Sequence, residues 1–231
     1  MTAPFSPPAT RTQDGHRNRN RIMACVDPSG LLVYLRTLKC ASTFFYNNFM
    51  QTFGWREIAW VDINWHRQKV FSHMLDPVKR RHKAVAEYID LCSLNTPEFM
   101  QNPNVQRFIR YIPVMDDHSS SYHDLYGYAC YSIDWIPLSG DHLTNILCTE
   151  MLCESYGHRY SGQWDHSHAH VGTKTKKDLE QQLENLWGAD QDEWVHNYLD
   201  RDVRLYQRVV NQFNYSAGSW RTMSWLTGRT Q

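Results

Sequence analysis

The sequence LLVYLRTLKCASTFF, residues 31–45, predicts a strand, a short polar loop and a helix in immediate succession. Its first five residues are apolar and rich in strand-forming types, and Pro28-Ser29-Gly30 before them is a turn signal. Phenylalanines then recur at helical spacing as far as Gly54, at positions 44, 45, 49 and 53. We therefore expect a buried strand whose carboxyl end leads through the loop into the N-terminus of a helix.

A loop between a strand and a helix N-terminus is a general site for anions. Backbone N–H groups without helical acceptors and the positive end of the helix dipole both face the ligand there. The loop from Thr37 to Thr43 adds the ammonium of Lys39 and the hydroxyls of Ser42 and Thr43. From these residues alone, an anion-binding loop and an ordinary turn capped by Ser or Thr stay equally open. The glycine-rich pattern G-x-x-x-x-G-K-[ST] is absent, which removes the main support for ATP or GTP hydrolysis.

The rest of the chain alternates predicted strands and helices. Asp76-Pro77 opens one helix, because Asp is a good N-cap and Pro is favoured at the first helical position. The alternation predicts an α/β fold, with a mainly parallel sheet covered by helices on both faces. Further strands are expected at 56–63, 69–75 and 126–136, and helices at 77–92, 97–111, 144–156, 176–187 and 190–213.

Length and charge indicate one folded domain and no general affinity for polyanions. The 231 residues suit a single domain, which we place at 23–231 behind a basic, Pro-containing tail at 1–22. The tail is expected to be mobile on its own, and it is a candidate contact in a homo-oligomer or a larger assembly. The formal net charge of zero argues against chain-wide attraction to nucleic acid or membrane, so neither is expected as a partner.

The cysteines and the hydropathy pattern predict a cytoplasmic protein. The six cysteines form no compact disulfide framework, so we expect reduced thiols, with a single bridge in a secreted protein as the alternative. No apolar run approaches the ~18 residues of a membrane span. No secretory signal is visible at the N-terminus either.

The segment LRTLKCASTFF, residues 35–45, resembles the 5′-phosphosulfate loop of the sulfotransferase family. In that family a strand leads into Lys-x-Gly/Ala-Ser/Cys-Thr and then a helix. Lys39, Ala41, Ser42 and Thr43 take those places in this chain.

A second segment, VFSHMLDPVKRRHKAVAEY at 70–88, is similar to the family's 3′-phosphate segment, with Asp76-Pro77 and Arg80 matching. Leu75 stands where the family has an Arg that binds the 3′-phosphate, and Lys83 stands where it usually has a Ser. Losing one charge-assisted contact to phosphate costs about 1.5–3 kcal/mol. Arg80, Lys83 or Arg81 could compensate, since all three lie on the first turns of one helix, and Arg80 and Lys83 are three apart and share a face.

Two later segments resemble carbohydrate-type sulfotransferases: Asp116 to His118, and Tyr198 to Tyr206 with Asp202 inside it. The resemblance implies a P-loop-like three-layer fold that binds 3′-phosphoadenosine 5′-phosphosulfate. It implies transfer of the sulfuryl group to a hydroxyl acceptor, in this subgroup a carbohydrate, without a metal. The implied nucleotide-binding residues are Thr37, Lys39, Cys40, Ala41, Ser42, Thr43, Arg80 and Lys83, with Lys39 also catalytic. The alternative is a protein that keeps the fold as a binding or structural component of an assembly, for example of a virus particle (virion).

Transfer to a hydroxyl also needs a general base, and the family places a His or Glu after the second strand. His66 and Asp62 lie in that part of this sequence, and the unperturbed pKa of His suits neutral pH. His118 is a further candidate on the acceptor side. The alternating histidines at 166, 168 and 170 would share one side of an extended segment, but they lack a clear Cys or carboxylate partner, so no metal is expected.

Overall fold

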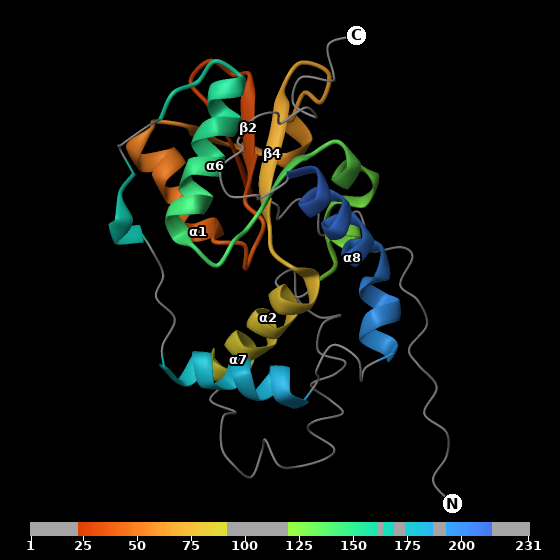
Figure 1. Ribbon diagram of the computed structural model, residues 1–231. Coiled ribbons are helices and arrows are strands. Elements are labelled where there is room, and N and C mark those ends of the chain that lie inside the picture. The colour runs from red at the N-terminus through yellow and green to blue at the C-terminus, as the bar shows by residue number, and fades with distance from the viewer. Residues whose placement is uncertain (1–22, 92–119, 161–163, 169–173, 187–192, 214–231) are drawn as a thin grey trace, which may run out of the picture.

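A computed structural model describes residues 23–91, 120–160, 164–168, 174–186 and 193–213. Its centre is a five-stranded sheet in the order β3-β1-β2-β4-β5 (Figure 1). The strands are β1 (Met23–Val26), β2 (Leu32–Leu35), β3 (Arg56–Ala59), β4 (Lys69–Met74) and β5 (Asp134–Pro137). Strand β4 pairs in parallel with both β2 and β5, whereas β1 pairs antiparallel with β2 and β3. The α/β class is confirmed, but the prediction of a mainly parallel sheet is wrong, because the sheet is mixed.

Strand β1 is the source of this difference, since a short turn joins it to β2 and a short turn permits only antiparallel pairing. The buried Asp27 builds the turn. One carboxylate oxygen accepts the N–H groups of Leu31 and Leu32 at 2.9 and 2.7 Å, and the other accepts that of Ser29 at 3.0 Å. Gly30 has a φ of +78°, the left-handed conformation that glycine adopts without strain. The turn signal before β2 therefore marks a hairpin and not only the start of one strand.

The helices follow the sequence pattern, with one clear exception. They are α1 (Ser42–Asn47), continued by the π-helix η3 (Asn48–Thr52), α2 (Pro77–Leu91), α5 (Tyr122–Tyr126), α6 (His142–Ser155), α7 (Lys174–Leu186) and α8 (Glu193–Phe213). Short 3₁₀ segments are η4 (Trp60–Asp62), η6 (Gly127–Tyr131) and η7 (His166–His168). The helices predicted around 77–92, 144–156, 176–187 and 190–213 are confirmed, while 97–111 lies outside the described residues.

The exception is the strand predicted at 126–136, most of which is helical. The hydroxyl of Ser121 accepts the N–H of Asp124 at 2.9 Å and so caps α5. Gly127, with a φ of +56°, ends α5 and leads into η6. The aromatic residues of this segment suit a strand by propensity, but the cap and the glycine start and stop a helix, and strand β5 begins only at Asp134.

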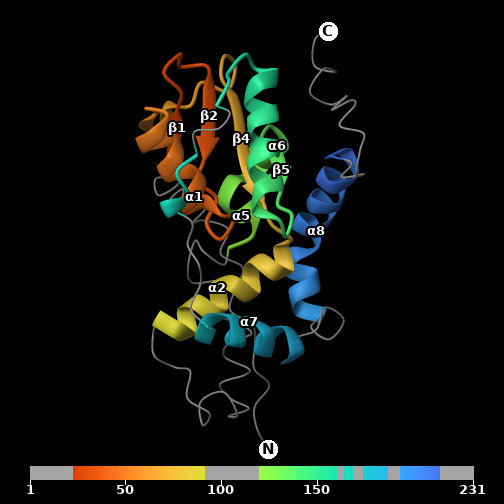
Figure 2. The ribbon, with the colours of Figure 1, turned by 60° about the vertical axis from the view of Figure 1, so that its left-hand side comes forward.

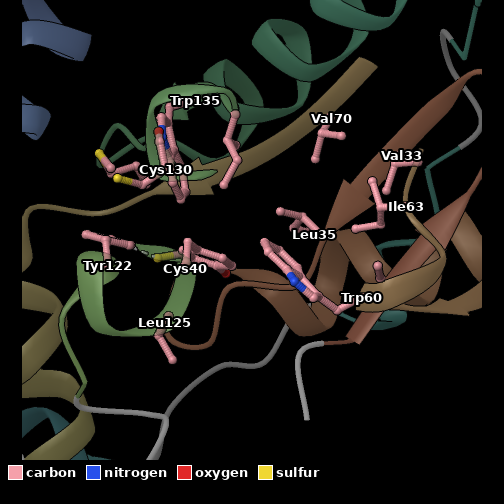
Figure 3. Packing of buried hydrophobic residues seen from close by; sticks show 14 of the residues in the cluster. Val33, Leu35, Cys40, Trp60, Ile63, Val70, Tyr122, Leu125, Cys130 and Trp135 are labelled. Carbon is pink, nitrogen blue, oxygen red and sulfur yellow. Dashed lines mark hydrogen bonds between the residues drawn. The ribbon is translucent and has the colours of Figure 1, made fainter. Parts of the chain in front are cut away.

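Two hydrophobic clusters cover the two faces of the sheet. Tyr34 and Phe71 lie on the face covered by α1, η3 and α6. Val33, Leu35 and Val70 lie on the other face, with α5, η6 and α8 (Figures 2 and 3). Neighbouring residues of one strand belong to opposite clusters, as the two-residue period of a strand requires. Helices therefore cover both faces, as expected.

Helix α2 leaves the sheet from the end of β4 and packs against α7 and α8, beyond the carboxyl ends of β2 and β4 (Figure 1). Arg81 is 1% exposed there, although its place among basic residues favours a solvated face. Helix α7 comes from a segment about a hundred residues further along the sequence, so the pattern of α2 alone gives no sign that it is covered.

The described cysteines Cys25, Cys40, Cys130, Cys148 and Cys153 are buried and free, which agrees with the expected reduced thiols. Among the described helices, none combines the length and apolar character needed to cross a bilayer.

Candidate functional site

The candidate site lies where β2 and β4 end. The loop at 36–41 joins β2 to α1, and Leu75-Asp76 joins β4 to α2. Because β2 and β4 are adjacent and parallel, both connections lie at the same edge of the sheet. Asp76 caps α2 as predicted, since its Oδ1 accepts the N–H groups of Val78 and Lys79, both at 3.0 Å.

The loop backbone has two left-handed residues, neither of them glycine. Lys39 has a φ of +65° and Ala41 a φ of +52°, while Cys40 between them has a negative φ. Alternating hands of this kind are typical of anion-binding loops, although the N–H of Cys40 itself donates to the carbonyl of Thr37 at 3.3 Å. Each left-handed residue costs about 1–2 kcal/mol. Ala41 is also the N-cap of α1 and contributes no side-chain bond, so the first N–H groups of the helix remain for a ligand or solvent.

Thr37 and Cys40 attach the loop to the hydrophobic core. The hydroxyl of Thr37 is buried and lies 2.7 Å from Ser72 Oγ and 2.5 Å from the hydroxyl of Tyr126. The thiol of Cys40 is buried 3.3 Å from the hydroxyl of Tyr122, and burial raises its pKa. Both side chains are therefore part of the core, and neither can contact a ligand without breaking these contacts.

Arg80 fixes the loop to the rest of the edge. Its Nε donates to the carbonyl of Leu38 at 3.0 Å and its Nη1 to the carbonyl of Ser120 at 2.5 Å. Its guanidinium lies over the ring of Tyr122, 4.8 Å from the centroid, and the residue is 2% exposed. Sequence reasoning assigned Arg80 to a phosphate, whereas the structure uses its charge to hold two backbone carbonyls.

Lys39, the central cation of the predicted site, forms an ion pair with Glu87 of α2. Both side chains keep some exposure, 13% for Lys39 and 28% for Glu87. Lys83 is half-buried one turn earlier on α2 and, with Arg80, acts electrostatically on the Cys40 thiol. The structure therefore brings Lys39, Arg80 and Lys83 together, with Glu87 as an additional carboxylate among them.

Ser42 and Thr43 begin α1 beside this cluster. Ser42 is 4% exposed, and the hydroxyl of Thr43 accepts from Nη2 of Arg36 at 3.4 Å. The Arg36 guanidinium lies 5.1 Å from the centroid of the Tyr46 ring. Arg36 thus adds a cation to the N-terminus of α1 that the sequence motif did not single out.

The two predicted bases, Asp62 and His66, lie in the connection from β3 to β4, which runs from the end of the sheet that holds the loop to the opposite end. His66 is exposed and lies three residues before Lys69, the first residue of β4. Lys69 pairs with Leu32, the first residue of β2. His66 is thus separated from the loop by the length of β2, roughly 13 Å or more for four residues. Asp62 is exposed in η4 after β3, whose last residue Ala59 pairs with Met23. The carbonyl of Met23 accepts the N–H of Arg36, so β3 ends at the same end of the sheet as the loop, and η4 with Asp62 follows directly.

Sequence reasoning missed a buried carboxylate that organises this region. Asp202 of α8 is 1% exposed and accepts the N–H groups of Tyr122 and His123 at 2.5 and 3.2 Å. It also lies 2.5 Å from Nδ1 of His123, and this bond, with a smaller contribution from Cys130, raises the pKa of His123 to about 11. The resemblance at Tyr198 to Tyr206 includes Asp202, but only the fold shows that Asp202 holds the start of α5.

Through Tyr122, Asp202 also supports the connection after β4. The hydroxyl of Tyr122 donates to the carbonyl of Leu75 at 2.8 Å and lies 3.0 Å from the N–H of the same residue. Leu75 stands where the resembled family has its phosphate-binding Arg. At this position the chain therefore has no cation, and the backbone N–H and carbonyl of Leu75 are bonded to the hydroxyl of Tyr122.

Neither a metal site nor a known relative guides the assignment. No group of three or more His, Cys, Asp or Glu suited to a metal occurs in the part of the chain that the structure describes, and His118 and His170 lie outside that part. Comparison with protein-family models, curated proteins and solved structures found no match to this chain.

Proposed function

We propose that the chain is a sulfotransferase-like protein whose loop at 37–43 binds the 5′-phosphosulfate of 3′-phosphoadenosine 5′-phosphosulfate. The observation that carries the proposal is the left-handed pair Lys39 and Ala41 between a central parallel strand and a helix N-terminus. Residues other than glycine keep such strained conformations where the surroundings impose them, and these conformations cluster at ligand sites. The family's loop has Gly or Ala at the place of Ala41, which is consistent with a left-handed backbone there.

In the proposed reaction, an acceptor hydroxyl, most simply of a carbohydrate, attacks the sulfur in line with the leaving phosphate. The new oxygen–sulfur bond forms as the bond from sulfur to the 5′-phosphate oxygen breaks, and the hydroxyl proton passes to a base. Lys39 would stabilise the charge that develops on the leaving oxygen, and the N–H groups of the loop would hold the phosphate. Asp62 is the proposed base, because it closely follows β3, which ends at the same end of the sheet as the loop.

Donor binding requires Lys39 to exchange Glu87 for the phosphosulfate. Both side chains keep some exposure, so an anionic ligand can compete with Glu87 for the ammonium of Lys39. Removing the carboxylate charge should therefore strengthen anion binding, whereas removing the ammonium should weaken it.

The test is calorimetric titration with the desulfated product, 3′-phosphoadenosine 5′-phosphate. We expect micromolar binding by the wild type, about tenfold or greater weakening in Lys39→Ala, and about two- to fivefold tightening in Glu87→Gln. Lys79→Ala is the matched control, because Lys79 is an exposed lysine on the same helix. Asp62→Asn should leave binding intact and abolish transfer. A folded wild type that does not bind at millimolar product would refute the proposal.

A second function, a binding or structural component of an assembly such as a virus particle, is favoured by one observation. The guanidinium of Arg80 is used by Leu38 and Ser120, and Leu75 carries no charge, so Lys83 is the candidate that remains for a 3′-phosphate. Absence of product binding, together with a defined oligomer in analytical ultracentrifugation, would support this function over the first.

A further inference from the structure

A pair of exposed aromatic rings stands on η6, away from the loop at 37–43. Tyr128 is 90% exposed and Tyr131 is 47% exposed. A 3₁₀-helix has three residues per turn, so side chains three apart emerge from the same side. Exposed apolar side chains are ordinary when scattered singly, but neighbouring ones form a patch of the kind that binds ligands.

Tyr131 is held in place by a chain of hydrogen bonds that begins in the core. Its hydroxyl lies 3.0 Å from Nε2 of His123, whose Nδ1 lies 2.5 Å from the buried carboxylate of Asp202. The rings of Tyr131 and His123 also meet edge to face, with centroids 5.5 Å apart. A surface phenol fixed in this way loses little conformational freedom when a ligand binds, which favours affinity.

A cation and a cavity adjoin the same ring. The guanidinium of Arg208 on α8 lies 6.0 Å from the centroid of Tyr131. A cavity of about 210 Å³ lies beside this ring. Its lining includes the polar residues Arg208, Tyr131 and Gln212 and the apolar residues Leu205 and Val209. This volume is below the ~300–1,000 Å³ of sites for drug-sized molecules, so it suits one ring of a small ligand.

The exposed charge beside the cavity is that of Arg208, and it favours an anion. Arg208 presents five donors and no acceptor, whereas the imidazole of His123 behind Tyr131 is paired with the carboxylate of Asp202. Asp134 also borders the cavity, but it is 8% exposed and accepts from the hydroxyl of Tyr156 at 2.5 Å, and Asp124 accepts from that of Tyr198 at 2.6 Å.

We propose that Tyr128, Tyr131 and Arg208 form a binding site for an acidic saccharide, a sugar that bears a carboxylate or a sulfate. A pyranose ring has a face of C–H groups that packs on a phenol ring, while its anionic group pairs with the guanidinium fork. Gln212 and the hydroxyl of Tyr131 supply partners for sugar hydroxyls. The site uses no residue of the loop at 37–43 and stands whether or not the chain transfers sulfate.

The test is saturation-transfer difference NMR of the full chain without nucleotide. The probes are methyl β-glucuronide and methyl β-glucoside, which differ in a carboxylate against a hydroxymethyl group. We expect the glucuronide to bind with millimolar affinity and the glucoside to bind about tenfold more weakly.

Variants at Tyr128 and Arg208 test two of the three proposed residues. Tyr128→Ala should weaken glucuronide binding about three- to tenfold, and Arg208→Gln should remove the preference for glucuronide over glucoside. Leu143→Ala changes an exposed apolar residue on α6 and should leave binding as in the wild type, as should Lys39→Ala. Because Tyr128 is largely exposed, its truncation should preserve the fold, and circular dichroism checks this. The proposal would be overturned if both sugars bound equally, or if neither gave a saturation-transfer signal at millimolar concentration. Binding as in the wild type by Tyr128→Ala and Arg208→Gln would overturn it as well.

Discussion

His73 in the middle of β4 should make the protein sensitive to mild acid. Its ring is fully buried and stacks on Phe45 with centroids 3.7 Å apart. Thr149 donates its hydroxyl to the carbonyl of Asn145 at 2.7 Å, so its oxygen accepts from Nε2–H of His73 at 2.8 Å. Nδ1 then accepts from the hydroxyl of Tyr34 at 3.3 Å. The neutral ring is thus satisfied, and burial lowers its pKa to about 3.

The sign and size of the effect follow from the difference between the folded and unfolded pKa values. The unfolded chain takes up a proton near pH 6.5, whereas the folded protein does so only near pH 3. Between these values, the unfolded state binds more protons, so stability falls as pH falls, by about 1.4 kcal/mol per unit. From pH 7.5 to pH 5 this amounts to about 2 kcal/mol, a large part of the 5–15 kcal/mol typical of a domain.

The assay is urea unfolding of the wild type and His73→Gln at pH 7.5, 6.5, 5.5 and 5.0. Glutamine keeps hydrogen-bonding groups but does not titrate, so the variant is less stable at pH 7.5 and lacks this part of the pH dependence. The stability difference between the two proteins should therefore shrink by about 2 kcal/mol between pH 7.5 and 5. Aspartates with lowered pKa values, such as Asp27, act mainly below this window and cancel in the difference. A difference that stays constant with pH would refute the assignment of a neutral, buried His73.

Two further predictions concern the edge of the sheet. Arg80→Met should lower the free energy of unfolding by about 2–5 kcal/mol, because it leaves the carbonyls of Leu38 and Ser120 without their donor. In the same urea titration, the control Lys79→Met should change it by less than about 0.5 kcal/mol. Equal stability of the two variants would contradict the role of Arg80. The raised pKa of His123 contributes stability that is complete below pH 6.5 and is lost as pH rises toward about 11. The wild type should therefore lose part of its advantage over His123→Gln between pH 6.5 and 9.5, and a constant advantage would count against the His123–Asp202 pair.

Much of the fold could be predicted because its signals are local. The run Leu32–Leu35, the phenylalanine period of α1 and the Asp76-Pro77 start of α2 each lie within a few residues of the element that they specify. Strand β1 and the helices α5 and η6 could not be predicted in this way. The four residues of β1 are too few to show a period, and the aromatic residues at 122–131 suit a strand until the Ser121 cap is seen.

The candidate site, too, could be predicted from the sequence only in part. The residues of the loop at 37–43, and their place between a strand and a helix N-terminus, follow from the sequence. The roles of the charged side chains do not, since each depends on a partner far away in the chain. Arg80 meets the carbonyl of Ser120 and Lys39 meets Glu87, while Asp202 meets His123 across 79 positions.

The sequence by itself therefore determined the α/β class and the strand–loop–helix unit. Only the tertiary structure decided the mixed sheet, the burial of Arg80 and Arg81, and the separation of His66 from the loop. The reason is physical. Propensity, caps and hydrophobic periods act between neighbours in the chain, whereas the free energy of a charge depends on the groups that fold around it.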